Sequence, residues 1–272
     1  MYKNIMDLHV HTDNSFDGNH SVMRMCESAQ DKGLRAIAFT DHIEADCFRE
    51  HRYDRVAAQA YFDISKARSA FCGTLLVCQG IELGQAMYNQ EVSEELFRKY
   101  KYDILVASLH NLRNGHDFSV PDYDEYEDDI IDAMLQEYFD ELVILSGWDK
   151  LDTLAHMTYP LRYICGKYGK KVDMSRYSEK IDATLKNLAD NDKALEINTS
   201  GLRQEIGTTM PDESIVRRFK ELGGKYITIG SDSHYAEDIG KGIVQGMDIA
   251  LRCGFDSVTL FQQHEAIPIK IE

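Results

Sequence analysis

The sequence lacks the features that mark membrane-spanning, secreted and multidomain proteins. It has 4 Pro among 272 residues and no low-complexity stretch, so no segment is typical of a linker between domains. No stretch approaches the roughly 20 apolar residues of a membrane span, and no secretory signal precedes the first charged residues. We therefore expect one domain, comprising residues 1–272, in a soluble cytoplasmic protein.

Paired cysteines are also missing. The 6 Cys are scattered along the chain without a C-x-x-C pair, which excludes a metal site built from thiolates. Because no secretory signal accompanies them, they do not indicate a disulfide framework either. The cysteines therefore point neither to a metal site nor to an extracellular location.

Basic charge is scarce. The chain has 30 Lys and Arg against 46 Asp and Glu, a formal net charge of −16, and no basic stripe. Such a field repels the phosphates of nucleic acids and anionic membrane surfaces, so we expect neither as a partner. We expect no obligate protein partner. A small anionic substrate remains compatible with this charge, because divalent cations invert the local potential around a site.

Short apolar runs alternate with amphipathic stretches along the chain. This alternation predicts an α/β fold with a parallel sheet, either open or closed into a barrel. Runs of strand length lie at 5–10, 36–40, 75–83, 104–109, 153–157, 195–198 and 226–230. Stretches of helical period lie at 22–29, 56–71, 128–145, 177–189 and 213–222.

Each of the seven predicted strands ends in a cluster of His, Asp, Glu or Asn. The clusters are DLHVH (7–11), TDH (40–42), GIELG (80–84), SLHN (108–111), LAH (154–156), EIN (196–198) and GSDSH (230–234). In a barrel all strands end at one mouth, whereas an open sheet feeds its crevice from two or three strands. The clusters therefore predict a TIM-barrel-like (β/α) barrel. A further run at 257–261 is a possible eighth strand, without a ligand at its end.

The two ends of the chain carry the same ligand spacing. His9 and His11 are two residues apart, so on a strand both imidazoles lie on one face. Asp232 and His234 repeat this spacing, and barrel closure would make the first and last strands neighbours. Such clusters suit Zn²⁺, Mn²⁺ or Fe²⁺ and predict the multinuclear metal site of a metal-dependent hydrolase.

Glu82 ends a nine-residue apolar run and is flanked by Gly80 and Gly84. A carboxylate there is costly to bury unless something pairs with it. An ion pair with Lys or Arg is one interpretation, but no basic residue is close in sequence. A carboxylate that bridges two metals is the other, and it explains the small neighbours.

The complete set of clusters resembles the PHP (polymerase and histidinol phosphatase) family. The resemblance rests on DLHVHTDNSFDG at 7–18, TDH at 40–42, SLHN at 108–111 and SDSH at 231–234, and covers nearly the whole chain. Within the family it is greatest to stand-alone histidinol-phosphate phosphatases. It implies a single PHP-type metallophosphoesterase domain folded as a distorted seven-stranded barrel.

The resemblance also implies two to three divalent metal ions (Zn, Mn or Fe) and assigns their ligands. The first metal would be bound by His9, His11, Glu82 and Asp232. The second would share Glu82 and add His110 and His156. The third would be bound by Asp17, His42 and His234, with Asp17 standing where many relatives have His.

A hydroxide held between two metals that share Glu82 would attack phosphorus, because metal binding lowers the pKa of water to about 7. The leaving alkoxide would take a proton from Asp232 or from a metal-bound water. Arg162 and Arg203 follow barrel strands and are candidates for gripping two phosphate oxygens at once, or else form surface salt bridges. His116, in the loop after the fourth ligand cluster, is a further candidate substrate contact.

The resemblance implies hydrolysis of the phosphomonoester L-histidinol phosphate to L-histidinol and phosphate, a step of histidine biosynthesis. Another PHP phosphoesterase, acting on a nucleotide, a sugar phosphate or phosphotyrosine, is the alternative. A non-catalytic PHP scaffold is disfavoured, because the chain retains every expected ligand.

Overall fold

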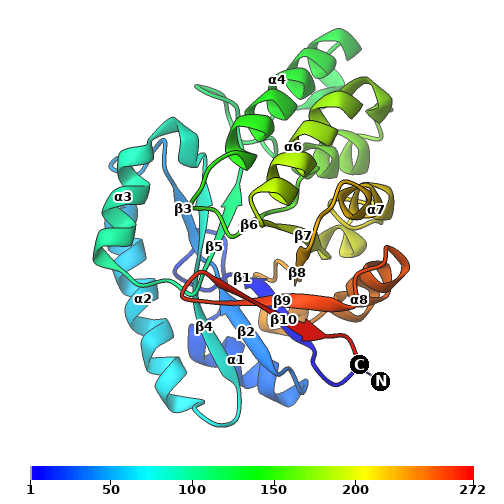
Figure 1. Ribbon diagram of the computed structural model, residues 1–272. Coiled ribbons are helices and arrows are strands. Elements are labelled where there is room, and N and C mark those ends of the chain that lie inside the picture. Colours follow the sequence, from blue (N-terminus) through cyan, green and yellow to red (C-terminus); the bar gives the residue numbers. More distant parts are fainter. Residues whose placement is uncertain (1) are drawn as a thin grey trace.

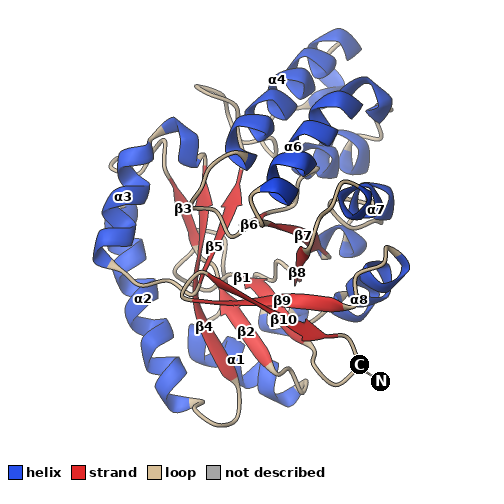
Figure 2. Ribbon diagram, in the orientation of Figure 1, coloured by secondary structure: helices blue, strands red, loops and turns tan. Residues whose placement is uncertain are grey.

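Seven parallel strand positions form the nearly closed barrel that the sequence predicts, and helices surround it (Figures 1 and 2). The computed structural model describes residues 2–272. The barrel strands follow the order β1-β2-β4-β5-β6-β7-β8, with β3 paired to β4. Their bounds are β1 Met6–Val10, β2 Ala36–Phe39, β3 His42–Glu44, β4 Leu76–Gly84, β5 Ile104–Ser108, β6 Thr153–Leu154, β7 Ala194–Asn198 and β8 Tyr226–Gly230.

Strand β3 continues the path of β2 along the long strand β4. Ala36 of β2 pairs with Leu76 near the start of β4, and His42 of β3 pairs with Glu82 near its end. The two short strands therefore share one position in the barrel, interrupted at residues 40–41. The eight strands fill seven positions for this reason, and the interruption brings His42 next to Glu82.

The barrel closes between its first and last strands at the carboxyl end. Val10 forms a parallel bridge with Ser233. The Asp232 peptide N–H donates to the His9 carbonyl at 2.8 Å, and the His11 N–H donates to the Ser233 carbonyl at 2.9 Å. The predicted closure is confirmed, and it brings the His9–His11 and Asp232–His234 pairs together.

The barrel strands are buried on both faces, as expected for a parallel sheet covered by helices. All five residues of β5 are buried. Each covering helix packs against the outer face of the barrel through one apolar stripe. In α7 the stripe is Ile215, Val216 and Phe219, and the carboxylate of Asp212 caps the helix by accepting from the Ser214 and Ile215 peptide N–H groups.

The five predicted helices are confirmed within a few residues, and three α-helices were not predicted. The helices are α1 Val22–Asp31, α2 Tyr53–Ala70, α3 Gln90–Lys99, α4 Asp128–Ser146, α5 Tyr159–Leu161, α6 Ser178–Asp190, α7 Glu213–Glu221 and α8 Ile243–Arg252. The segments missed are α3, α8 and α5, which continues as a π-helical turn over Arg162–Lys167. Among residues 2–272, no helix has the length and apolar character needed to cross a membrane.

The run at 257–261 is a strand but not an eighth barrel strand, so that prediction was wrong in its placement. Strand β9, Ser257–Gln262, pairs antiparallel with β10, Glu265–Lys270, in a separate hairpin. At its turn, the His264 peptide N–H donates to the Asp103 carbonyl at 3.0 Å. Because Asp103 immediately precedes β5, the hairpin covers the amino ends of the barrel strands and leaves the carboxyl ends open (Figure 1).

Candidate metal centre

The carboxyl ends of the barrel strands bring all nine predicted ligands into one cluster. Seven of them are buried, while Asp17 and His234 lie at the solvent side, with 38% and 19% of their side chains exposed. Three-ligand groups whose donor atoms lie within 4.8 Å of one another occur four times in this cluster. They are His11–His42–His234, His9–Glu82–His156, His9–His11–Asp232 and His42–Glu82–His110.

Glu82 lies at the centre of the cluster and is fully buried. Its two carboxylate oxygens are surrounded by five imidazoles, and among residues 2–272 no peptide N–H donates to them. The nitrogen–oxygen distances are 2.9 Å to His156 Nε2, 3.0 Å to His42 Nδ1, 3.1 Å to His110 Nε2, 3.3 Å to His9 Nε2 and 3.4 Å to His11 Nε2. Burial acts to raise the pKa of the Glu82 carboxyl, but the imidazoles outweigh it and hold that pKa well below its ordinary value.

His9, His11 and Asp232 form the part of the cluster that barrel closure assembles. His11 Nε2 lies 3.2 Å from Asp232 Oδ1 and 3.0 Å from His9 Nε2. Asp232 has φ of 53°, a left-handed conformation that turns the chain sharply after β8. Directly before this turn, a Cβ at Gly230 would collide with the Cβ of His9, so only glycine permits this approach.

The hydrogen bonds behind these two rings fix where their lone pairs point. His9 Nδ1 faces Glu196 Oε1 at 2.7 Å, and His11 Nδ1 faces the Ser15 hydroxyl, which itself donates to Asp41. Each Nδ1 is therefore the protonated nitrogen, inferred from its acceptor, and each Nε2 directs a lone pair into the cluster. Burial, with a smaller contribution from neighbouring imidazoles, lowers the pKa of His11 to about 3, so that ring stays neutral.

Two lone pairs that face each other at 3.0 Å repel unless a positive charge lies between them. The surrounding carboxylates make such a charge favourable: burial alone would lower the pKa of His9, but Glu196 and Glu82 raise it well above its ordinary value. His156 Nδ1 is in addition buried without a hydrogen-bond partner. Nitrogen and oxygen donors in this arrangement fit divalent transition metals.

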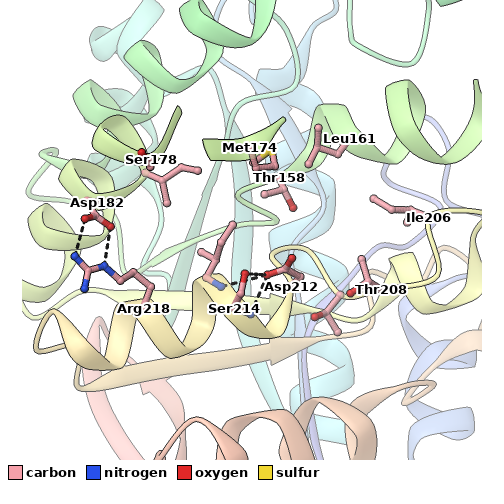
Figure 3. A pocket seen from close by; sticks show the side chains of 13 residues that line it. Thr158, Leu161, Met174, Ser178, Asp182, Ile206, Thr208, Asp212, Ser214 and Arg218 are labelled. Atoms are coloured by element: carbon pink, nitrogen blue, oxygen red, sulfur yellow. Dashed lines mark hydrogen bonds and ion pairs between the residues drawn. The ribbon is translucent and has the colours of Figure 1, made fainter. Parts of the chain in front are cut away.

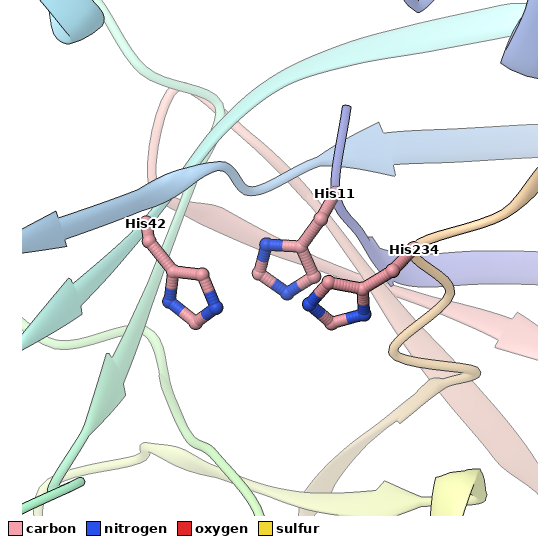
Figure 4. A group of neighbouring side chains, drawn as sticks. All are labelled: His11, His42 and His234. Carbon is pink, nitrogen blue, oxygen red and sulfur yellow. The ribbon is translucent and has the colours of Figure 1, made fainter. Parts of the chain in front are cut away.

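The solvent side of the cluster contains His11, His42 and His234, whose rings lie close together in Figure 4. The His11 ring stacks on His42 with centroids 4.2 Å apart and on His234 with centroids 4.3 Å apart. Asp17 approaches from the loop after β1, with Oδ2 at 3.0 Å from His234 Nε2 and 3.8 Å from His42 Nε2. The predicted third ligand set is thus assembled, and His11 joins it as a fourth neighbour.

Glu44 and Glu196 were not assigned a role from the sequence, although they orient the histidines. Glu196 contacts His9 Nδ1 and accepts from the His156 peptide N–H at 2.8 Å. Glu44 Oε1 lies 3.1 Å from His110 Nδ1, and a Cβ at Gly84 would collide with the Glu44 carboxylate. Such contacts fix the tautomer of a metal-binding imidazole.

A sequence signal existed for both carboxylates. Glu44 follows His42 by two residues in β3, so both side chains lie on one face of the strand. Glu196 belongs to the EIN cluster that ends β7. The sequence does not predict the short strand β3, because the TDH cluster ends one apolar run, whereas in the structure its His42 also begins the next strand.

A cavity of about 280 Å³ opens above the cluster and exposes part of it. Arg162 lines this cavity, and its Nη1 lies 3.8 Å from Asp232 Oδ2. Arg162 therefore lies beside the cluster, as the sequence predicts. His116 is exposed and lines an adjoining cavity of about 850 Å³ instead. The two cavities share Phe16, Glu44, His110 and Asp117.

Arg203 does not line either of these cavities. Its Nη2 donates to the Ser231 carbonyl at 2.8 Å, and its Nε lies 3.9 Å from Asp238. The guanidinium therefore holds the turn that carries Asp232. The predicted substrate contacts of Arg162, Arg203 and His116 all stay predictions.

Another cavity, of about 370 Å³, lies between α6, α7 and the segment around α5 (Figure 3). Its lining includes Asp182, which is paired to Arg218, and Asp212, which caps α7. It shares no lining residue with the cavity above the cluster and contains no His, Cys or Glu. None of the nine predicted ligands lines this cavity.

Known proteins are similar to this chain in sequence and in fold. A probable histidinol-phosphatase from Clostridium acetobutylicum is 30% identical over 261 residues, which cover 93% of this chain and 96% of that protein. The histidinol-phosphatase of Lactococcus lactis is 26% identical over 259 residues, covering 94% of each chain.

Among solved structures, histidinol phosphate phosphatase from Lactococcus lactis, in complex with zinc, L-histidinol and phosphate, superposes with a TM-score of 0.78 at 23% identity. It covers 97% of this chain and 99% of that one, and at this identity it establishes the fold. Residues 7–200 match the PHP domain family. The chain belongs to the PHP domain family.

Proposed function

We propose that this protein is a metal-dependent phosphomonoesterase that hydrolyses L-histidinol phosphate to L-histidinol and phosphate, a reaction of histidine biosynthesis. The observation that carries the proposal is the Glu82 carboxylate, which is buried among five imidazoles, three of which (His42, His110 and His156) line an open cavity. The naming of the Clostridium acetobutylicum and Lactococcus lactis relatives as histidinol-phosphatases supports the choice of substrate.

We infer two to three divalent ions, of Zn, Mn or Fe, as the cofactors. His9, His11, Glu82 and Asp232 would hold the first, and His110 and His156 would hold the second together with Glu82. His42, His234 and Asp17 would hold the third, beside His11. The presence of zinc in the Lactococcus lactis structure supports zinc as one of the metals.

Divalent ions bound there would lower the pKa of water and neutralise charge on the phosphoryl oxygens. The protein supplies the geometry for this chemistry. Glu82 belongs to two of the three-ligand groups, and five imidazoles contact its two carboxylate oxygens. Asp232 lines the cavity beside Arg162. The proton for the leaving alkoxide would come from Asp232 or from a water held by the metal ions.

Arg162 is the guanidinium that lines the cavity above the cluster, and we propose that it grips two phosphate oxygens at once. The guanidinium carbon of Arg162 lies 5.5 Å from the centroid of the Tyr163 ring, a cation–π contact that favours this position of the side chain. Arg203 would act through the Ser231–Asp232 turn that it holds. We propose it as a positioning residue for Asp232.

The test is phosphate release from L-histidinol phosphate by zinc- or manganese-loaded protein, measured beside p-nitrophenyl phosphate and a panel of nucleotides. We expect kcat/KM for L-histidinol phosphate to exceed the others by about a thousandfold or more, since specific contacts to the leaving group act only with this substrate. Removal of metal by a chelator should abolish the activity. Equal and feeble rates across the panel would contradict the proposed substrate.

A larger phosphomonoester, such as a nucleotide, a sugar phosphate or a phosphotyrosine peptide, is the second candidate. The adjoining cavity of about 850 Å³ favours it, because that cavity shares four lining residues with the one above the cluster. A nucleotide preferred over L-histidinol phosphate in the same panel would select this candidate.

A further inference from the structure

Asp17 and His234 differ from the other seven predicted ligands in their distance from the barrel strands. Those seven lie on a strand or within two residues of a strand end. Asp17 lies seven residues after Val10, where β1 ends, and His234 lies four residues after Gly230, where β8 ends. Because loops are more mobile than strands, the geometry of the third ligand group depends on the contacts that hold these two loops.

Two hydrogen bonds join the loops to each other. The Asn19 peptide N–H donates to the His234 carbonyl at 3.0 Å, and the Ala236 peptide N–H donates to His20 Nδ1 at 3.2 Å. The distance between Asp17 and His234 therefore depends on the part of the chain that follows His234.

Lys32, at the C-cap of α1, contacts that part of the chain. The η6 segment comprises residues 235–240 and contains the 3-10 helix η6, Ala236–Asp238. The Lys32 ammonium donates to three carbonyls of the η6 segment at distances of 3.1, 2.9 and 3.0 Å, those of Ala236, Glu237 and Ile239. An ammonium has three N–H donors, so these carbonyls occupy all of them.

The hydrogen bonds of Lys32 stabilise the η6 segment and not the end of α1. A lysine at the end of a helix commonly binds the last carbonyls of that helix. Here all three hydrogen bonds of Lys32 Nζ go to the other segment. Among residues 2–272, no peptide N–H donates to the Glu237 or the Ile239 carbonyl, so the ammonium satisfies groups that the backbone leaves free.

Two further contacts hold the η6 segment. The Gly240 peptide N–H donates to Asp7 Oδ2 at 2.8 Å, and the Ser28 hydroxyl of α1 donates to the Ala236 carbonyl. Hydrogen bonds from an ionised donor are stronger than those between neutral groups. Lys32, with three such bonds, therefore holds the middle of the segment more firmly than Ser28 does with one.

We propose that Lys32 is a positioning residue for the third metal ion. Its ammonium holds the η6 segment so that His234 faces Asp17, whose Oδ2 lies 3.0 Å from His234 Nε2. The inference rests on the metal sites of the proposed function and concerns the third ligand group. The first and second groups take their ligands from strands and strand ends, so their metal ions do not depend on Lys32.

Four substitutions test the inference. Lys32→Met keeps most of the length of the side chain and removes the ammonium, whereas Lys32→Arg keeps a cationic donor. Ser28→Ala removes the neutral contact to the same segment. Lys241→Met is the matched control, because Lys241 Nζ contacts the side chain of Asp238 at 2.6 Å and thus reaches the η6 segment without binding its carbonyls.

Zinc titration of metal-free protein by calorimetry measures the effect on each ion. We expect wild-type protein to bind three zinc ions, and His234→Ala identifies the third by removing it. In Lys32→Met the Kd of this ion should rise about tenfold or more, as for loss of a residue that orients a metal ligand, while the other two Kd values change by less than about twofold. Lys32→Arg should recover part of the loss, Ser28→Ala should show a smaller rise, and Lys241→Met should match wild type.

Phosphate release at increasing zinc concentration gives a second measurement. The zinc concentration that gives half-maximal activity should rise about tenfold in Lys32→Met, and excess zinc should restore the wild-type rate. A general distortion of the barrel would lower the rate at every zinc concentration. A loss of rate that excess zinc does not restore would therefore contradict the inference.

An unchanged Kd of the third ion in folded Lys32→Met, or an equal weakening of all three ions, would also overturn the inference. So would wild-type protein that binds no third ion. The proposed function fails in a different way. Wild-type protein that binds three zinc ions and does not hydrolyse L-histidinol phosphate would contradict the proposed substrate and leave the role of Lys32 intact.

Discussion

The two ends of the barrel both bury carboxylates, but they satisfy them in different ways. At the amino ends of the strands, Asp103 and Asp152 precede β5 and β6. Asp103 accepts from the Gln79 peptide N–H at 2.8 Å and pairs with Arg68 at 3.0 Å. Within the described part of the chain, residues 2–272, Glu82 at the carboxyl end has no such partners and its carboxylate is contacted by imidazoles only.

The hairpin turn completes the satisfied end. Asp152 accepts from the Leu105 peptide N–H and contacts His264 Nδ1, each at 2.7 Å. Hydrogen bonds and an imidazole within the protein therefore satisfy the Asp152 carboxylate and offset the cost of burying it. The contact between Asp152 and His264 therefore stabilises the position of the β9–β10 hairpin.

The difference teaches how to distinguish a structural carboxylate from a functional one. Asp7 and Asp41 lie inside the ligand motifs, yet Asp7 accepts from the Ser231 peptide N–H and Asp41 from that of Thr12, at 2.8 and 2.6 Å. They belong with Asp103, because peptide groups satisfy them. A carboxylate that only imidazoles satisfy leaves room for a cation, and Glu82 meets this condition.

The largest expected effect comes from Glu82→Gln, which keeps the shape of the side chain and removes its charge. Because one carboxylate serves two ligand groups, we expect kcat/KM to fall more than about a hundredfold, beyond the effect of changing a residue that merely orients a ligand. Phosphate release by protein reloaded with zinc or manganese measures this. Activity within tenfold of wild type would show that Glu82 is not the shared ligand.

The opposite end should respond in stability and not in catalysis. Asp103→Asn turns an amide N–H₂ toward peptide N–H donors and removes the partner of Arg68, so we expect the free energy of unfolding to fall by about 1–3 kcal/mol. Urea unfolding of metal-loaded protein measures the change. The values of kcat and KM should stay at wild-type levels; a large loss of kcat in folded protein would break the distinction between the two ends.

Much of this comparison was predictable from the sequence, because repeated ligands at strand ends carry a geometric constraint. The i, i+2 spacing of His9 and His11 predicts that both side chains lie on one face of a strand. Barrel closure then predicts that Asp232 lies next to them, as it does beside His11. The isolated position of Glu82 in an apolar run indicated a carboxylate without a basic partner. The structure has it in that environment.

The parts that escaped prediction depend on contacts between distant segments. The position of Asp103 before the run 104–109 places it at the amino ends of the strands, but its partners Gln79 and Arg68 come from other elements and cannot be predicted from the local sequence. Arg203 follows a barrel strand as Arg162 does, but the chain after β7 turns its guanidinium to the Ser231 carbonyl. The hairpin strand at 257–262 has the apolar content of a barrel strand, and only its antiparallel partner places it elsewhere.

A smaller effect should separate the two arginines at the open end. Arg162→Ala removes a guanidinium from the cavity wall, and we expect KM for L-histidinol phosphate to rise and kcat/KM to fall about tenfold or more. Arg203→Ala loosens the turn that carries Asp232, so kcat should fall more than KM rises. Steady-state kinetics of both variants measure the contrast. Wild-type constants in both would exclude a role for arginine in this site.

Metal binding by the cluster around Glu82 is the central claim, and counting the bound metal ions tests it most directly. We predict that wild-type protein, loaded with zinc or manganese and freed of excess metal by gel filtration, retains two to three equivalents per chain by elemental analysis. Asp103→Asn should retain the same number, whereas Glu82→Gln should lose most of it. Folded wild-type protein that retains less than one equivalent would contradict the central claim.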